Sequence, residues 1–133
     1  MSEEHAIKAR LTSRGGRLSR SAEFERVYRH GRSSATRHFV LYVFESPIAG
    51  PSRLGLSVSR KVGGAVQRNH VKRVLREAFA ELVEQVGEGH DLVVVARPGA
   101  AEMAERDGLA GVQEALAELL AKAGLTAAPA EGS

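Results

Sequence analysis

The strongest constraint on the fold of this chain is a long series of apolar residues that recur at spacings of three and four. The series follows Gly63 and Gly64 and ends before Gly87. Its members are Val71, Val74, Leu75, Ala78, Phe79, Leu82 and Val86. Residues at these spacings share one face of a helix, so the pattern predicts a long amphipathic α-helix that buries this face in a core.

The opposite face of the predicted helix carries cations in its first half. Arg68, Lys72 and Arg76 are four residues apart, and Asn69 and Arg73 form a second row beside them. Like charges at this spacing repel each other by roughly a few tenths of a kcal/mol per pair, and the helix dipole disfavours cations near the N-terminal end. Because this arrangement costs stability, it indicates a polyanionic partner such as RNA or DNA. The alternative is an ordinary solvated face, although such faces usually mix both signs.

The whole chain shows a similar division of charge. Its 133 residues have a formal net charge of only +3. Residues 1–76 contain 16 basic and 5 acidic residues, a charge of +11, whereas residues 77–133 contain 3 basic and 11 acidic residues, a charge of −8. No acidic residue occurs from Ser46 to Arg76, where seven basic residues lie, Arg53 among them. Such asymmetry favours a nucleic-acid partner, but two surfaces of opposite sign that pair within the fold or between two copies would also explain it.

A shorter helix is predicted over residues 21–30. Ser21 is suited to cap its N-terminus, and Gly31 is suited to the position after its last turn. Phe24, Val27 and Tyr28 share one face at spacings of three and four. Exposed aromatic rings stack on unpaired bases in proteins that bind single strands. For Phe24 burial in the core is the stronger expectation.

Three segments have strand character. Residues 39–44, which include Tyr42, are β-branched and aromatic, and residues 54–59 alternate with a period of two. A turn-rich connector joins these two segments, so we expect them to form an antiparallel hairpin. Residues 91–96 are almost uniformly apolar, which predicts a strand buried on both faces.

The remaining segments complete the organisation of the chain. Residues 100–107 are expected to form a short helical stretch, and residues 109–123 a last helix. We divide the chain into a flexible basic arm at 1–16, a single domain at 17–125 and a disordered tail at 126–133.

The predicted order of elements is α-β-β-α-β-α, with room for a further short strand near Arg17. Helices and strands mixed in this order predict an α+β fold in which helices pack on a sheet.

Signatures of catalysis are missing from the sequence. It contains no cysteine, which excludes disulfides, thiolate metal sites and a cysteine nucleophile, and which fits the reducing cytoplasm. The five histidines form no HxxxH or HExxH pattern, and neither a Walker loop nor a nucleophile elbow occurs. The longest strongly apolar run, 39–44, is far shorter than the ~20 residues of a membrane-spanning helix. We therefore expect no catalytic residue, no metal ligand and no membrane contact.

The segment from Arg60 to Phe79 resembles the bacterial ribonuclease P protein subunit. The signature of that family in this helix is Arg-Asn-Arg, followed by Lys-Arg and a further Arg. The residues that match it are Arg68, Asn69, Lys72, Arg73 and Arg76. His70 stands where the third residue of the signature is an arginine, so this site lacks a permanent cation. The resemblance extends over roughly residues 17–125.

The resemblance implies a two-layer α/β sandwich of the ribosomal protein S5 domain 2-like type, with a left-handed βαβ crossover. It also implies that the chain is the protein component of the ribonuclease P holoenzyme and assists a catalytic RNA in removing the 5′ leader of precursor tRNA. The partners would be the ribonuclease P RNA, bound one to one, and the precursor tRNA. Hydrolysis would belong to the RNA subunit, which requires Mg²⁺, and this chain would bind no cofactor through a motif of its own.

The resemblance also assigns the binding residues. The basic helix would contact RNA through Arg68, Asn69, His70, Lys72, Arg73 and Arg76. A cleft for the single-stranded leader would be lined by Phe24, Tyr28, Tyr42, Arg60 and Lys61. Two alternatives stay open: a ribosomal or other structured-RNA-binding protein of the same fold with no role in a reaction, and an autonomous nuclease.

Overall fold

In the computed structural model, residues 21–46 and 50–125 are described, and they form a four-stranded sheet with helices on both faces. The predicted arm at 1–16, the strand near Arg17 and the tail at 126–133 lie outside the described residues. The elements in chain order are α2 (Ser21–His30), β1 (Arg32–Ala35), β2 (Phe39–Glu45), β3 (Arg53–Ser57), α3 (Ala65–Val86), β4 (His90–Ala96) and α4 (Ala100–Lys122). This α-β-β-β-α-β-α order confirms the predicted α+β class.

The strand order in the sheet is β1-β2-β4-β3, and it corrects one prediction. β2 pairs antiparallel with both β1 and β4, and β3 pairs parallel with β4. The expected hairpin between residues 39–44 and 54–59 is therefore wrong. β4 separates these two strands because it is apolar toward both faces and is buried most completely at the centre of the sheet.

The hairpin partner of β2 is β1, which the sequence analysis missed. Its residues, Arg-Ser-Ser-Ala, are mostly exposed at the edge of the sheet and show no apolar pattern. On the opposite edge, β3, α3 and β4 form a βαβ unit with parallel strands. The left-handed crossover that the resemblance implies for this unit stays a prediction.

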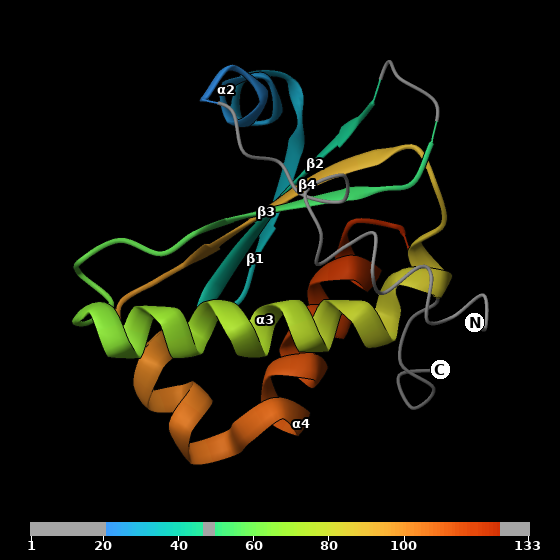
Figure 1. The fold of residues 1–133 in the computed structure, drawn as a ribbon. Helices are drawn as coiled ribbons and strands as arrows, with labels where there is room; N and C mark the ends of the chain where they lie inside the picture. The colour runs from blue at the N-terminus through green and yellow to red at the C-terminus, as the bar shows by residue number, and fades with distance from the viewer. Residues whose placement is uncertain (1–20, 47–49, 126–133) are drawn as a thin grey trace.

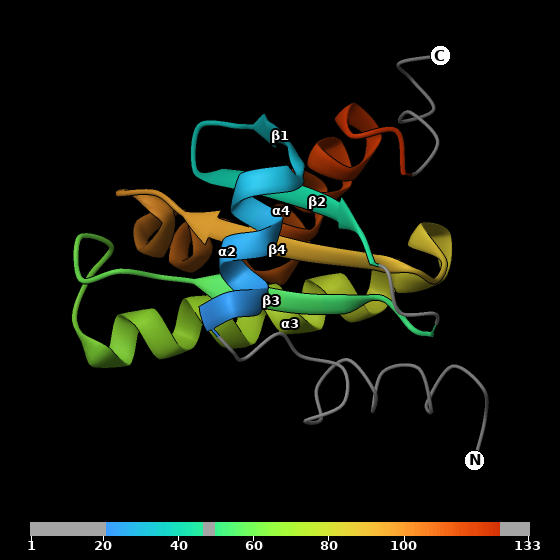
Figure 2. The ribbon, with the colours of Figure 1, turned by 90° about the horizontal axis from the view of Figure 1, so that it is seen from above.

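The two faces of the sheet are covered unequally. α3 and α4 pack on one face, whereas α2 is the helix of the described residues that crosses the other face (Figure 1). Seen from above in Figure 2, α2 runs across the strands and extends over only part of their length. The face toward α3 and α4 buries the main core, which includes Phe39, Leu41 and Val43 of β2. All seven members of the predicted apolar stripe of α3 are buried, which confirms the amphipathic helix.

The two predicted helical segments at 100–107 and 109–123 are both helical, and together they make up α4. Gly108 lies between them with a non-helical conformation (φ 68°, ψ −164°) that kinks the helix. A positive φ of this size is accessible to glycine without strain.

Gly31 is required at the end of α2 for a different reason from the expected one. The φ angle of Gly31 is not positive, so this residue does not form a left-handed cap. A Cβ atom at Gly31 would instead lie 2.5 Å from the carbonyl oxygen of Val27 and 2.6 Å from that of Val43. Only glycine allows the chain to pass so close to β2, and this close passage fixes the C-terminal end of α2 on the sheet.

Candidate nucleic-acid interface

The inner face of α2 holds a second, smaller core against the sheet. Val27 is fully buried and clusters with Val93 of β4. The half-buried neighbours that pack on this pair are Phe24, Tyr42, Phe44 and Val95. α2 therefore covers its part of the sheet through one central valine, with aromatic rings around it.

Three of the predicted leader-cleft residues come together beside this small core, and we call them the aromatic trio: Phe24, Tyr28 and Tyr42. The rings of Tyr28 and Tyr42 meet edge to face, with centroids 4.9 Å apart and an angle of 82°. Phe24 and Tyr28 lie 6.3 Å apart. Tyr28 is 39% exposed, whereas Phe24 is half-buried, as expected for a residue that also serves the core. The trio thus presents aromatic surface of the kind on which unpaired bases stack.

The other two predicted cleft residues, Arg60 and Lys61, lie apart from the trio. Both are exposed in the connection between β3 and α3. A row of half-buried strand residues leads from the trio toward the two cations: along the strands, the row next to Tyr42, Val93 and Gly55 consists of Val40, Val95 and Ser57. Alternation along the strands places this row on the same face as Tyr42. Ser57 of this row is the last residue of β3, and the two cations Arg60 and Lys61 follow it in the chain.

The basic residues of α3 differ in exposure. Asn69 and Arg73 are exposed, whereas the row formed by Arg68, Lys72 and Arg76 is half-buried beside the apolar stripe. Nε of Arg68 donates a hydrogen bond to the carbonyl oxygen of Gly63, at 3.2 Å. Arg68 thus holds the connection before the helix, and Arg73 lies on the outer surface.

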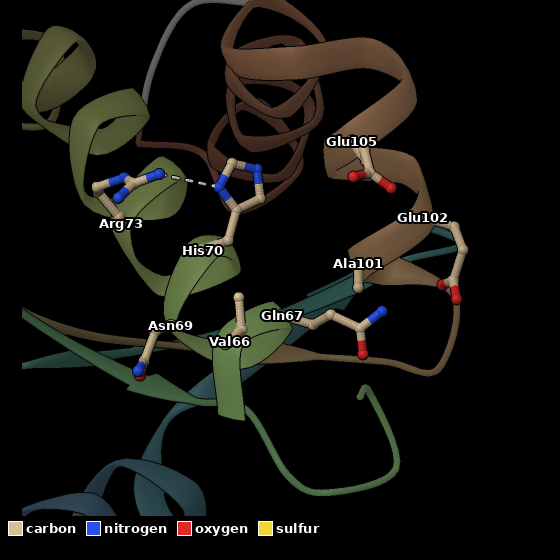
Figure 3. A pocket seen from close by; sticks show the side chains of 8 residues that line it. All are labelled: Val66, Gln67, Asn69, His70, Arg73, Ala101, Glu102 and Glu105. Atoms are coloured by element: carbon tan, nitrogen blue, oxygen red, sulfur yellow. Dashed lines mark hydrogen bonds between the residues drawn. The ribbon is translucent and has the colours of Figure 1, made fainter. Parts of the chain in front are cut away.

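His70 is linked to Arg73 on the exposed side of α3. Nη2 of Arg73 lies 3.1 Å from Nδ1 of His70 (Figure 3). A guanidinium only donates hydrogen bonds, so Nδ1 must act as the acceptor in this pair. The contact therefore requires a neutral imidazole, and in this arrangement Arg73 is the cation of the pair.

A cleft of about 450 Å³ lies between the N-terminal halves of α3 and α4. Figure 3 shows Glu102 and Glu105 projecting from α4 opposite the side chains of α3. The cleft is lined by Val66, Gln67, Asn69, His70, Arg73, Ala101, Glu102 and Glu105. The sequence analysis did not find it, because nothing in the sequence places residues 100–107 beside the basic helix. Among the described residues, no group of His, Cys, Asp or Glu is arranged to hold a metal ion.

A partly buried ion-pair network joins α2 to the two strands beneath its N-terminal end. Nε and Nη2 of Arg53 on β3 each donate to one carboxylate oxygen of Asp91 on β4, both at 3.0 Å. Nη1 of Arg53 donates to Oε2 of Glu23 on α2 at 2.7 Å. The hydrogen bond to Asp91, followed by that to Glu23, raises the pKa of Arg53. Arg53 was counted in the basic stretch of the sequence, but its charge is neutralised inside the fold and does not belong to the cationic surface.

This chain has a small α+β fold that combines a cationic helix with a partly exposed aromatic trio. These features place it in the class of RNA-binding proteins. The family model described as "Ribonuclease P" matches residues 13–124. The ribonuclease P protein component of Geobacillus thermodenitrificans is 45% identical over 108 residues, which are 81% of this chain and 86% of that protein. The chain belongs to the family of bacterial ribonuclease P protein components.

Solved structures of the same family share this fold. The RNase P protein of Staphylococcus aureus superposes with a TM-score of 0.74 at 35% identity, over 83% of this chain and 96% of that one. The RNase P protein of Thermotoga maritima superposes with a TM-score of 0.68 at 34% identity, over 75% of this chain and 90% of that one. The chain is thus a protein component of the ribonuclease P holoenzyme, a tRNA-processing endoribonuclease, and its partner is the ribonuclease P RNA. No helix in the described residues has both the length and the hydropathy to cross a membrane.

Proposed function

We propose that the aromatic trio and the adjoining strand residues Val40, Val95 and Ser57 bind the single-stranded 5′ leader of precursor tRNA. The observation that carries the proposal is the contact between Tyr28 and Tyr42, two rings 4.9 Å apart with Tyr28 open to solvent. An exposed tyrosine ring offers a π-face on which a base of any identity stacks. Arg60 and Lys61, exposed where the chain leaves the same sheet, supply charge for the leader backbone.

The second part of the proposal concerns α3, which docks on the ribonuclease P RNA through Arg68, Asn69, His70, Lys72, Arg73 and Arg76. The protein acts in a one-to-one complex in the cytoplasm, and it binds no cofactor of its own. The RNA subunit with its Mg²⁺ ions carries out the hydrolysis, while the protein adds positive charge to a complex of two polyanions. Since the product tRNA has lost its leader, leader binding strengthens the affinity for substrate over product.

Reconstitution at low Mg²⁺ tests this assignment against its alternatives. Precursor tRNA is incubated with the purified chain alone, with the ribonuclease P RNA alone, and with both together. We expect cleavage only when both are present, because the added cations offset the repulsion between the two RNAs. Cleavage by the RNA-free chain would identify an autonomous nuclease. Failure to rescue the RNA subunit would favour a structured-RNA-binding protein with no role in the reaction.

The role of α3 predicts a change in the salt dependence of RNA binding. Arg73→Ala is expected to reduce the slope of log K against log salt for the ribonuclease P RNA by about one, since one phosphate contact is lost. Arg106→Ala is the matched control, because Arg106 is an exposed arginine on α4 that pairs with Asp107. Filter binding from 50 to 400 mM salt, a range of about one decade, measures both slopes. Equal slopes for the two variants would show that Arg73 makes no phosphate contact with the ribonuclease P RNA.

A further inference from the structure

Within the described residues, three contacts hold α2 along its length. α2 has ten residues, and a helix of this length is only marginally stable without tertiary packing. Its C-terminal end is fixed by the close passage of Gly31 along β2, and its middle by the buried Val27. Its first turn reaches the sheet through Glu23, whose carboxylate lies 2.7 Å from Nη1 of Arg53.

The contact at Glu23 has a defined direction. Arg53 is fixed by two parallel hydrogen bonds to Asp91, and the side chain of Asp91 is only 2% exposed. A guanidinium held in this way is planar and cannot rotate, so its remaining nitrogen donates along a fixed line. That line ends at Glu23, one residue before Phe24. An apolar contact at the same place would favour burial, but because it has no preferred direction it would not fix the angle of α2 on the sheet.

The network also lies where solvent weakens it little. The side chains of Arg53 and Glu23 are 20% and 18% exposed. By contrast, the pair formed by Glu25 and Arg29 on the same helix spans 3.7 Å with side chains that are 70% and 67% exposed. Exposed pairs at this spacing contribute little to helix position. Two glutamates of α2, two residues apart, thus differ in exposure and in partner: by the described contacts, Glu23 is bonded to the sheet and Glu25 to its own helix.

We infer that Glu23, Arg53 and Asp91 are positioning residues for the leader site. They hold the first turn of α2 at the angle that places Phe24 and Tyr28 against Tyr42. The inference rests on the proposed leader-binding function of the aromatic trio. It assigns leader affinity in part to three residues that touch no RNA, and it predicts that a change at Glu23 acts on the leader and not on the body of the tRNA.

The test compares Glu23→Ala with Glu25→Ala in the reconstituted holoenzyme. Both variants replace a glutamate of α2 by alanine, so they change the net charge equally. We expect Glu23→Ala to reduce the ratio of affinities for precursor and mature tRNA about fivefold, because the apparent dissociation constant rises as fewer molecules hold α2 in place. Glu25 lines a hollow together with Phe24 and Tyr28 but is bonded to Arg29 of its own helix, so Glu25→Ala is expected not to lower the ratio. Glu23→Gln, which keeps an acceptor for Arg53, is expected to give an intermediate ratio.

The outcomes separate failure of the inference from failure of the proposed function. If Glu23→Ala and Glu25→Ala give the same ratio while Tyr28→Ala lowers it, the positioning role is refuted and the leader site stands. If Tyr28→Ala also leaves the ratio unchanged, the leader site itself is refuted. A loss of equal size for precursor and mature tRNA would mean a general defect of the fold and would likewise overturn the inference. Should Glu23→Ala not fold, the same comparison is made with Glu23→Gln and Glu25→Gln.

Discussion

Replacing Tyr28 and Tyr42 together by alanine is expected to weaken the binding of precursor tRNA to the holoenzyme at least about 30-fold, since each lost stacking ring costs about 1–3 kcal/mol. Mature tRNA, which has no leader, is expected to bind the variant as it binds the unchanged holoenzyme. The physical reason is that the two rings, which meet edge to face with centroids 4.9 Å apart, belong to one aromatic cluster where α2 packs on the sheet. Equilibrium binding of the two tRNAs measures the effect.

Two controls separate stacking from a loss of exposed apolar surface. Tyr28→Phe keeps the ring and removes the hydroxyl, so it is expected to retain most of the leader affinity. Leu109→Ala removes a side chain on α4 that is 40% exposed, close to the 39% of Tyr28, and is expected to change neither tRNA's affinity. Equal losses for precursor and mature tRNA in the double tyrosine variant would contradict a leader site at the aromatic trio.

The sequence predicted the elements whose signal lies within one segment. The stripe from Val71 to Val86 defined α3, because seven apolar positions at helical spacing leave no other regular structure. The apolar run 91–96 predicted β4 for a similar reason, since a strand that is apolar toward both faces must lie inside a covered sheet. Phe24, Val27 and Tyr28 predicted the inner face of α2, and the structure packs Phe24 and Val27 against the sheet, while the exposed Tyr28 contacts the ring of Tyr42.

Strand pairing could not be predicted in the same way. The turn-rich connector after β2 indicated a reversal of the chain, but a reversal does not determine which strand becomes the neighbour. β4 pairs with β2 although it lies more than thirty residues further along the chain than β3. A strand that is apolar toward both faces gains more from a central place in the sheet than the short connection between β2 and β3 gains from a hairpin. The edge strand β1 gave no signal at all, since an exposed strand of four residues requires no apolar pattern.

The ion-pair network was hidden by sequence distance. Arg53 is 30 residues from Glu23 and 38 from Asp91, so no local pattern joins them. In the sequence Arg53 had the appearance of one more cation in a stretch free of acids. The one available signal was Asp91 itself, a carboxylate at the start of an apolar strand, because a buried acid must have a partner.

Asp91→Ala is expected to lower the free energy of unfolding by about 3 kcal/mol, the lower end of the cost of leaving a buried charge without its partner. The lower end applies because Arg53 keeps its contact with Glu23 and is one-fifth exposed. For a domain of this size the change corresponds to a fall in Tm of about 10 °C. Urea and thermal unfolding measure it. Asp107→Ala, which removes the partner of Arg106 at an exposed pair, is expected to shift Tm by no more than about 2 °C.

The pH dependence of this stabilisation follows from the charge of Arg53. Its pKa is raised by the hydrogen bonds to Asp91 and Glu23, so folding favours the protonated guanidinium. A raised pKa adds stability that is fully present below the ordinary pKa of arginine and is lost only above it. The difference in unfolding free energy between Asp91→Ala and the unchanged chain should therefore stay constant from about pH 6 to 9, where Arg53 is always charged. A difference that disappears within this range would mean that the lost stability does not come from the pairing of Arg53 with a carboxylate.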